Sequence, residues 1–322
     1  MDHVVVYQPI PEFLLEKLQQ KFSVSHFNKV TDDNRSEFEQ KVQGADGLLG
    51  AGWPITRAFL DKAPNLRVVS NISAGYDNFD IEELTKRGIM ATNSPDALTE
   101  TTADLIFGLL LSSARRIAEL DRLVRMKQWN GAIKNKHFGV DVHHKTIGIV
   151  GMGRIGRAVA RRAALGFNMK VLYHRRSRDK ESERMLGAEY CDLPELLGSS
   201  DYVCLTLPLT DSTYHLIDEQ EFNQMKPEAI LINGGRGPLL NEEALVTALK
   251  NNTIMAAGLD VYEKEPLSHD SELLSMRNVV LSPHTGSATE ETRTQMAVDA
   301  VENLLQALQG ETPMNLLNPE VE

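Results

Sequence analysis

Three short polar clusters in the second half of the sequence contain the residue types that the reduction of a carbonyl group requires. Arg236 lies in a glycine-rich turn, Asp260 and Glu265 belong to one acidic stretch, and His284 follows Ser282-Pro283. An arginine can stabilise the negative charge that develops on a carbonyl oxygen, and a histidine can donate a proton near neutral pH. A carboxylate beside the histidine would orient its ring. Each cluster alone is equally typical of a surface turn, an acidic loop or a structural histidine, but together they favour hydride transfer at a carbonyl carbon.

A glycine pattern earlier in the chain indicates where a dinucleotide would bind. The apolar run Thr146–Val150 leads into Gly151-x-Gly153-x-x-Gly156, and a segment with helical spacing follows. Gly151 permits a tight turn, Gly153 lets the backbone approach a pyrophosphate, and Gly156 lets helix and strand pack closely. The pattern alone could mark a tight turn in another α/β protein. A strand before it and a helix after it favour dinucleotide binding.

A basic run follows the second strand of this unit, about twenty residues after the glycines. An acidic residue normally ends that strand and binds the ribose hydroxyls, but this sequence has His174 followed by Arg175, Arg176 and Arg178. Guanidinium groups pair well with phosphate, whereas an acid would repel the 2′-phosphate of NADP. A solvated basic loop is the alternative interpretation. The position beside the expected ribose favours NADPH over NADH.

The reactive clusters follow stretches that are typical of short β-strands. Open α/β sheets bind ligands at the carboxyl ends of their strands, so the clusters are expected to lie at that edge of one sheet. Strands alternate with helical patterns throughout, which predicts two parallel-sheet α/β units. We predict strands at 4–7, 23–27, 45–49, 67–72 and 89–92 in the first unit, and at 146–150, 169–173, 201–207, 229–233, 255–260 and 278–282 in the second. Long helices are predicted at 99–127 and 288–309.

Composition limits the class of protein. The 322 residues suffice for about two domains, and 42% hydrophobic with 25% charged residues is ordinary for a globular chain. The net charge of −11 argues against a nucleic-acid surface. The sequence predicts neither a secretory signal nor a membrane span, and its two cysteines suggest no disulfide framework or metal site. We expect a cytoplasmic protein.

The ordered motifs resemble the signature of the D-isomer-specific 2-hydroxyacid dehydrogenases. They are Gly151–Gly156, Asn233-x-x-Arg236-Gly237, Asp260-x-x-x-x-Glu265-Pro266 and Ser282-Pro283-His284. The likeness covers essentially the whole chain, and Ser73–Asp80, Asp141–Thr146 and Ala288–Arg293 extend it to the bacterial reductases of glyoxylate, hydroxypyruvate and 2-ketogluconate within the family.

This resemblance implies a role for each reactive residue. Arg236 would bind the substrate, His284 would be the general acid and base, and Glu265 would be its partner. Asp260 would hold the nicotinamide carboxamide, and the backbone amides of Ala74 and Gly75 would take the substrate carboxylate. We expect further cofactor contacts at Thr102, Arg154, Ile155, Pro208, Thr213, Asn233, Gly234, Gly235, Gly286 and Ser287, and no metal.

The family also implies the domain arrangement and the assembly. A Rossmann dinucleotide-binding domain, residues 99–287, would be inserted in a flavodoxin-like substrate-binding domain made of residues 1–98 and 288–322. A homodimer would form through 99–142. The expected protein is therefore an NADPH-preferring reductase of short 2-keto acids, with NADH as the lesser cofactor. Two alternatives stay open: an NAD-dependent dehydrogenase of the D-lactate or phosphoglycerate type, and a dinucleotide-sensing protein resembling a corepressor.

Overall fold

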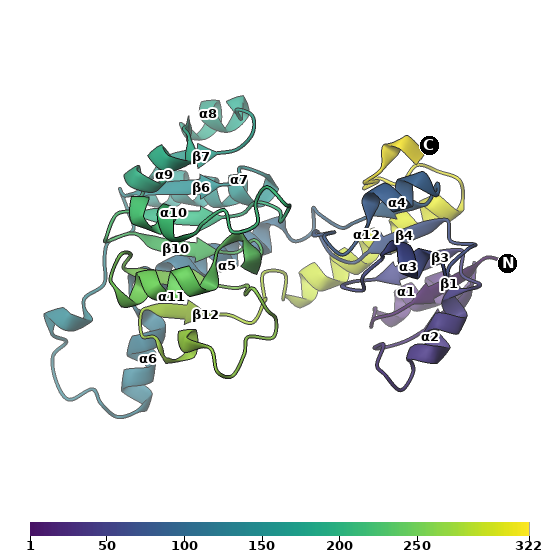
Figure 1. Ribbon diagram of the computed structural model, residues 1–322, viewed down its shortest axis with the longest axis horizontal. Coiled ribbons are helices and arrows are strands. Elements are labelled where there is room, and N and C mark those ends of the chain that lie inside the picture. Colours follow the sequence, from purple (N-terminus) through teal and green to yellow (C-terminus); the bar gives the residue numbers. More distant parts are fainter. Residues whose placement is uncertain (322) are drawn as a thin grey trace. The chain divides into compact units, whose positions relative to one another are not determined.

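The computed structural model describes residues 1–321 and divides into two compact units. Unit 1 contains Met1–Leu98 and the chain from Ser287 onward, and unit 2 is Thr99–Gly286. The chain therefore leaves unit 1, builds unit 2 as one continuous segment and returns to unit 1. Figure 1 shows the elements of each unit.

Unit 1 is built on a five-stranded sheet in the order β2-β1-β3-β4-β5, in which every pair of neighbours is parallel. The strands are β1 (His3–Val6), β2 (Ser23–His26), β3 (Gly47–Gly50), β4 (Val68–Asn71) and β5 (Met90–Thr92). Each of the five overlaps a stretch that the sequence predicts as a strand, and no end differs from the predicted one by more than two residues.

Helices cover this sheet, and the last of them comes from the C-terminal part of the chain (Figure 1). They are α1 (Glu12–Gln19), α2 (Arg35–Val42), α3 (Arg57–Leu60), α4 (Ile81–Lys86) and α12 (Glu290–Leu308), with a 3₁₀ turn η5 (Pro319–Val321). The helix α12 packs on β3 and β4. A Cβ at Gly47 would lie 3.0 Å from Leu304 Cδ1, so this strand glycine allows the close approach of α12.

Unit 2 contains a seven-stranded, entirely parallel sheet in the order β12-β11-β10-β9-β6-β7-β8. Its strands are β6 (Thr146–Val150), β7 (Lys170–His174), β8 (Glu189–Tyr190), β9 (Tyr202–Leu205), β10 (Ile230–Asn233), β11 (Ala256–Leu259) and β12 (Val279–Leu281). The predicted fold class, two doubly wound parallel-sheet units, is confirmed. The two-residue edge strand β8 was missed because it is too short to show a periodic pattern.

The helices of unit 2 differ from prediction at one place. One helix predicted over 99–127 is two, α5 (Thr99–Ala114) and α6 (Ile117–Arg125), because Arg116 adopts a left-handed backbone with φ of 54°. The helix after the glycine pattern, α7 (Arg154–Arg161), continues as a π-helical turn η2 (Arg162–Gly166). The others are α8 (Lys180–Leu186), α9 (Leu193–Ser199), α10 (Glu219–Gln224), α11 (Glu242–Lys250), and the 3₁₀ turns η1 (Asn135–His137), η3 (Gly237–Leu239) and η4 (Glu272–Ser275).

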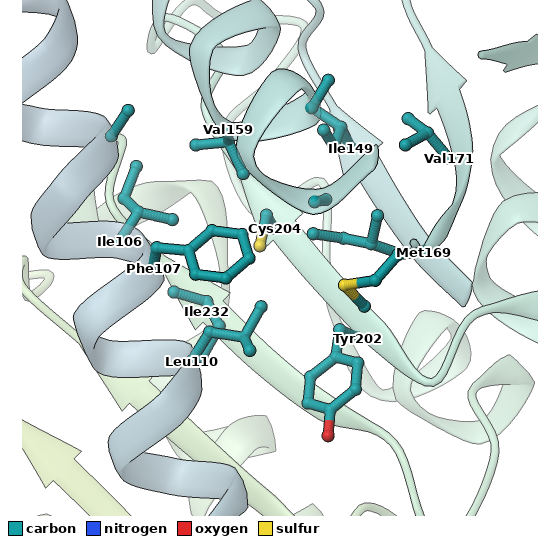
Figure 2. Close-up of a cluster of buried hydrophobic side chains, with 14 of the residues drawn as sticks. Ile106, Phe107, Leu110, Ile149, Val159, Met169, Val171, Tyr202, Cys204 and Ile232 are labelled. Atoms are coloured by element: carbon teal, nitrogen blue, oxygen red, sulfur yellow. The ribbon is translucent and has the colours of Figure 1, made fainter. Parts of the chain in front are cut away.

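Unit 2 has two hydrophobic cores: one includes α9, α10 and α11, and the other lies between the sheet and the helices α5 and α7. Figure 2 shows Ile106, Phe107 and Leu110 of α5 beside Ile149, Cys204 and Ile232 of the central strands, with Val159 of α7 nearby. Each of these side chains is at most 5% exposed. Such packing fixes the strand ends to which the polar clusters are attached.

No helix among residues 1–321 is long and apolar enough to span a bilayer.

Candidate active site

The glycine-rich turn after β6 has the geometry of an anion-binding cradle. Gly151 has φ of 104°, and a Cβ there would lie 2.7 Å from the backbone nitrogen of Leu207. A Cβ at Gly156 would lie 2.2 Å from the carbonyl oxygen of Gly151, whereas one at Gly153 would meet nothing within 4 Å. No side chain caps α7, which begins beyond Gly153. An open turn at the amino end of a helix suits a pyrophosphate, so these residues fit a dinucleotide.

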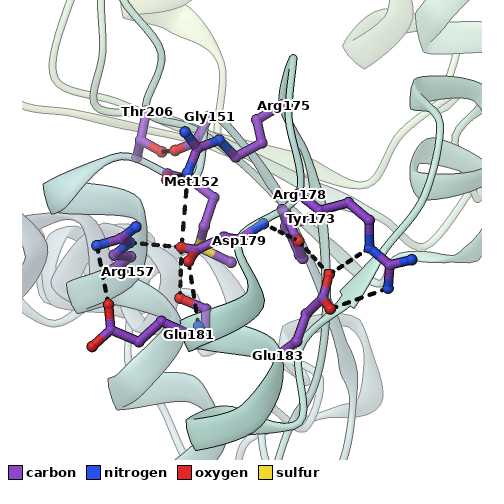
Figure 3. A network of polar contacts seen from close by, with 11 residues as sticks. Gly151, Met152, Arg157, Tyr173, Arg175, Arg178, Asp179, Glu181, Glu183 and Thr206 are labelled. Atoms are coloured by element: carbon purple, nitrogen blue, oxygen red, sulfur yellow. Dashed lines mark hydrogen bonds and ion pairs between the residues drawn. The ribbon is translucent and has the colours of Figure 1, made fainter.

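Arg175 and Arg178 of the basic run lie in a polar network that includes this turn (Figure 3). Arg175 donates from Nη1 to the carbonyl oxygen of Met152 at 3.1 Å. Arg178 makes a two-point ion pair with Glu183, from Nε to Oε1 at 2.9 Å and from Nη2 to Oε2 at 3.1 Å. Arg176 is exposed, and His174 contacts the carbonyl oxygen of Cys191 at 3.1 Å. Arg175 and Arg178 thus differ in how firmly the protein already holds them.

Asp179 is the buried carboxylate of this network, and it is not among the residues predicted from the sequence. Its Oδ2 accepts from Arg157 Nε at 2.6 Å and from Ser182 Oγ at 2.8 Å, and it lies 3.8 Å from Arg175 Nη1. Burial alone would raise the pKa of Asp179, but the hydrogen bonds from Ser182 and Arg157 outweigh it and hold the pKa below its ordinary value. The sequence signal was an Asp three residues before Ser182 at the start of α8, a typical N-cap.

The turn after β10 presents Arg236. The buried Asn233 side chain spans this turn, donating from Nδ2 to the carbonyl oxygen of Arg236 at 2.9 Å and accepting from the amide of Gly235 at 3.1 Å. A Cβ at Gly237 would lie 1.8 Å from the carbonyl oxygen of Tyr262. Because only a glycine permits that approach, the Arg236 turn is held against the segment that carries Glu265.

His284 and Glu265 form the pair that the sequence predicted as acid and partner. Nδ1 of His284 lies 2.7 Å from Oε2 of Glu265, and the other carboxylate oxygen accepts from the amide of Tyr262 at 3.1 Å. Both side chains remain partly accessible, with 49% and 37% of their surface exposed. A cavity of about 520 Å³, lined mainly by apolar side chains such as Leu267 and Leu274, adjoins this pair. The histidine is therefore oriented while its other ring nitrogen stays available.

Asp260 organises the loop that carries His284. It is 2% exposed, its Oδ1 accepts from the amide of Thr285 at 2.7 Å, and its Oδ2 accepts from the amide of Gly286 at 2.9 Å. The amide of His284 donates to the carbonyl oxygen of Asp260 at 2.8 Å. The structure thus gives Asp260 a role in shaping the loop that its sequence position alone did not indicate.

The remaining predicted cofactor residues are distributed over several loops. Thr102 donates from Oγ1 to the carbonyl oxygen of Gly286 at 3.0 Å, and Thr213 donates to that of Pro208 at 2.8 Å. Arg154 and Ile155 open α7, and Gly234 and Gly235 lie in the turn after β10. Ser287 belongs to unit 1.

Ala74 and Gly75, predicted to bind the substrate carboxylate, lie in the loop after β4 in unit 1. Their carbonyl oxygens accept hydrogen bonds from Asn93 and Asn71.

The chain is similar to known proteins over nearly its whole length. The family model for the NAD binding domain of D-isomer specific 2-hydroxyacid dehydrogenases matches residues 107–286. A glyoxylate/hydroxypyruvate reductase B of Yersinia pestis (strain Pestoides F) is 52% identical over 318 residues, which cover 99% of this chain and 98% of the relative.

Two solved structures are similar over nearly their full lengths. An NADPH-dependent glyoxylate/hydroxypyruvate reductase from Sinorhizobium meliloti, in complex with NADP and malonate, has a TM-score of 0.86 and 32% identity, covering 99% of this chain and 97% of that one. A glyoxylate reductase from Paecilomyes thermophila has a TM-score of 0.90 and 31% identity, with coverage of 100% and 99%.

Proposed function

The chain belongs to the D-isomer-specific 2-hydroxyacid dehydrogenases, and from that premise we propose that it reduces short 2-keto acids to D-2-hydroxy acids with NADPH as the preferred cofactor. Family membership makes it an NAD(P)-dependent oxidoreductase. The names of its relatives favour glyoxylate and hydroxypyruvate as substrates over D-lactate or phosphoglycerate. The observation that carries the proposal is the 2.7 Å contact between His284 and Glu265.

The residues of unit 2 fit a nicotinamide dinucleotide. The Gly151–Gly156 turn would hold the pyrophosphate, because its middle glycine leaves the backbone open to approach. Arg175 and Arg176 would face the 2′-phosphate, since guanidinium groups pair with phosphate by charge-assisted hydrogen bonds. When bound, the cofactor supplies the hydride. Asp260 and the turn after β10 complete the proposed contacts.

The protein's part in the reaction is to bind the keto acid and move one proton. With Nδ1 of His284 donating to Glu265, Nε2 is the nitrogen that would give its proton to the substrate oxygen. Glu265 stabilises the charged ring and fixes its tautomer. The Arg236 guanidinium would offset negative charge on that oxygen. The amides of Ala74 and Gly75 would receive the carboxylate.

A homodimer is the assembly we propose, formed through the region of α6. No residue of α6 is buried, and Ile117, Val124, Met126, Trp129 and Phe138 are each more than half exposed. Exposed apolar side chains gathered in one segment are typical of an interaction surface. Light scattering during size-exclusion chromatography should give twice the 35.9 kDa mass of one chain. A mass of one chain at micromolar concentration would contradict the dimer.

The substrate is tested by comparing kcat/KM for glyoxylate, hydroxypyruvate and 2-ketogluconate with saturating NADPH. We expect activity with all three and the highest values for the two short acids. D-lactate and 3-phosphoglycerate, offered with NAD⁺, serve as the comparison in the oxidative direction. A higher kcat/KM for either of them than for the keto acids would overturn the proposal.

A further inference from the structure

In the loop Ser73–Tyr76, the first three carbonyl groups accept hydrogen bonds from three buried residues, Asn71, Asn93 and Ser94, which we call the buried cluster. The carbonyl oxygen of Ser73 accepts from the amide of Ser94 at 2.9 Å. That of Ala74 accepts from Asn93 Nδ2 at 2.7 Å, and that of Gly75 accepts from Asn71 Nδ2 at 2.8 Å. Three successive peptide groups are therefore fixed in orientation.

Fixing a carbonyl also fixes the next amide. In a trans peptide the C=O of one residue and the N–H of the following residue point in opposite directions. Asn93 therefore turns the amide of Gly75 away from the cluster, and Asn71 does the same for the amide of Tyr76. Within residues 1–321, the amides of Ser73, Ala74, Gly75 and Tyr76 make no hydrogen bond. Successive outward amides form the kind of concavity that binds anions.

We propose that Asn93 and Asn71 are positioning residues for substrate binding: they hold the amides of Gly75 and Tyr76 in place to receive the carboxylate of the 2-keto acid. The inference rests on the proposed function for the identity of the anion. It adds Tyr76 to the amides that Ala74 and Gly75 were expected to contribute. Asn93 and Asn71 act through the loop and do not touch the substrate themselves.

The surroundings of both asparagines support this assignment. Asn71 is fully buried, and its Oδ1 has no hydrogen-bond partner among the described residues. Its side chain is therefore oriented by its Nδ2, which donates to the carbonyl oxygen of Gly75 and, at 3.2 Å, to Asn78 Oδ1. An unpaired buried oxygen weakens stability, and groups retained despite such a cost are concentrated at functional sites. Here the benefit is the hydrogen bond to Gly75.

Asn93 is held from behind by the C-terminal part of unit 1. Its carbonyl oxygen accepts from Asn303 Nδ2 at 3.1 Å, and Asn303 also exchanges hydrogen bonds with Asn315. Asn303 lies in α12 and is 1% exposed. The helix α12 therefore helps to hold the loop in place, because its Asn303 binds Asn93, and Asn93 in turn orients the amide of Gly75.

The test compares Asn93→Ala and Asn71→Ala with a matched control, Asn318→Ala. Asn318 is also buried in unit 1 and also donates to a backbone carbonyl, that of Ile89 at 2.9 Å, but it does not contact the Ser73–Tyr76 loop. All three variants lose a buried amide. Loss of binding confined to the first two therefore cannot come from destabilisation alone.

The readouts are the Kd of oxamate, an unreactive 2-keto acid analogue, on the NADPH-loaded enzyme and the KM and kcat for glyoxylate. We expect Asn93→Ala and Asn71→Ala to raise Kd and KM by roughly ten- to a hundredfold, as when a hydrogen bond to a charged group is lost, with kcat and the NADPH Kd nearly unchanged. Asn318→Ala should lower Tm and leave Kd and KM unchanged. Equal effects in all three variants would overturn the inference.

Two further measurements keep the test decisive. Asn93→Ser leaves a smaller cavity than Asn93→Ala and should also raise the oxamate Kd. In the wild-type enzyme, the side-chain amide resonances of Asn71 and Asn93 should shift when oxamate is added, while that of Asn318 should not. Absence of both effects would overturn the positioning role. An enzyme that binds oxamate through this loop but does not reduce glyoxylate would contradict the proposed function instead.

Discussion

Replacing Arg175 by alanine should weaken the binding of NADPH far more than that of NADH. The side chain is one-third exposed, reaches back to the carbonyl oxygen of Met152 in the glycine-rich turn, and lies 3.8 Å from Asp179. It is therefore preorganised beside the proposed pyrophosphate site. Arg178 belongs to the same basic run, but its guanidinium group already forms a two-point ion pair with Glu183.

These contacts set the expected magnitudes. A hydrogen bond to a charged group contributes about 1.5–3 kcal/mol, which corresponds to roughly one to two decades in the Kd of NADPH for Arg175→Ala. Arg178 would have to give up its ion pair with Glu183 to reach the phosphate, and the loss of an exposed pair, about 0–1 kcal/mol, subtracts from what the new contact contributes. Arg178→Ala should therefore raise the NADPH Kd less than Arg175→Ala does. The NADH Kd should change little in either variant, because NADH lacks the 2′-phosphate.

Fluorescence titration of both cofactors against the wild type and each variant provides the measurement. Arg184→Ala is the control, since Arg184 is an exposed arginine of α8 and its removal changes the net charge equally. Equal losses for NADPH and NADH in Arg175→Ala would refute the reasoning. So would a larger NADPH-specific loss in Arg178→Ala than in Arg175→Ala.

Three further predictions follow from the site. His284→Ala should cut kcat for keto-acid reduction by about 10²–10⁴ and Glu265→Gln by less, with NADPH binding retained; a near-wild-type rate in His284→Ala would remove the proposed acid. The lowered pKa of Asp179 contributes stability that is present above its unfolded pKa and is lost as pH falls through its folded pKa. Asp179→Asn should therefore lower the free energy of unfolding at pH 7 by about 1–3 kcal/mol, measured by urea denaturation. If the wild type and the variant still differed in stability by this amount at about pH 2, the prediction would be contradicted. Gly156→Ala should destabilise and abolish cofactor binding because its Cβ would meet the Gly151 carbonyl oxygen, whereas Gly108→Ala on α5, with open space around it, should do neither.

Much of this molecule could be predicted because its chemistry lies in short local patterns. The spacing of Gly151, Gly153 and Gly156 specifies one backbone turn, and the structure has a φ of 104° and a backbone contact where glycine is required. Strand-like runs before Arg236 and His284 were enough to place both at strand ends. The parallel sheets follow from the alternation of strands and helices.

The parts that escaped prediction depend on neighbours distant in sequence or on single backbone angles. Nothing in the apolar spacing of 99–127 shows that Arg116 turns left-handed, because its hydrogen bonds to the carbonyl oxygens of Lys136 and Phe138 come from a later loop. Asp179 meets Arg157 only after the sheet brings two helices together. Asn71 and Asn93 likewise look like ordinary residues at the ends of strands in the sequence. Only the fold shows that both donate hydrogen bonds to the same loop.

The central claim is hydride transfer from NADPH to a 2-keto acid that yields the D-hydroxy acid. It is tested most directly by letting the wild-type enzyme reduce hydroxypyruvate with NADPH in which both hydrogens at C4 of the nicotinamide ring are deuterium, followed by chiral analysis and mass spectrometry of the product. We predict D-glycerate with one deuterium on carbon 2. L-glycerate, unlabelled glycerate or no turnover at all would contradict the account.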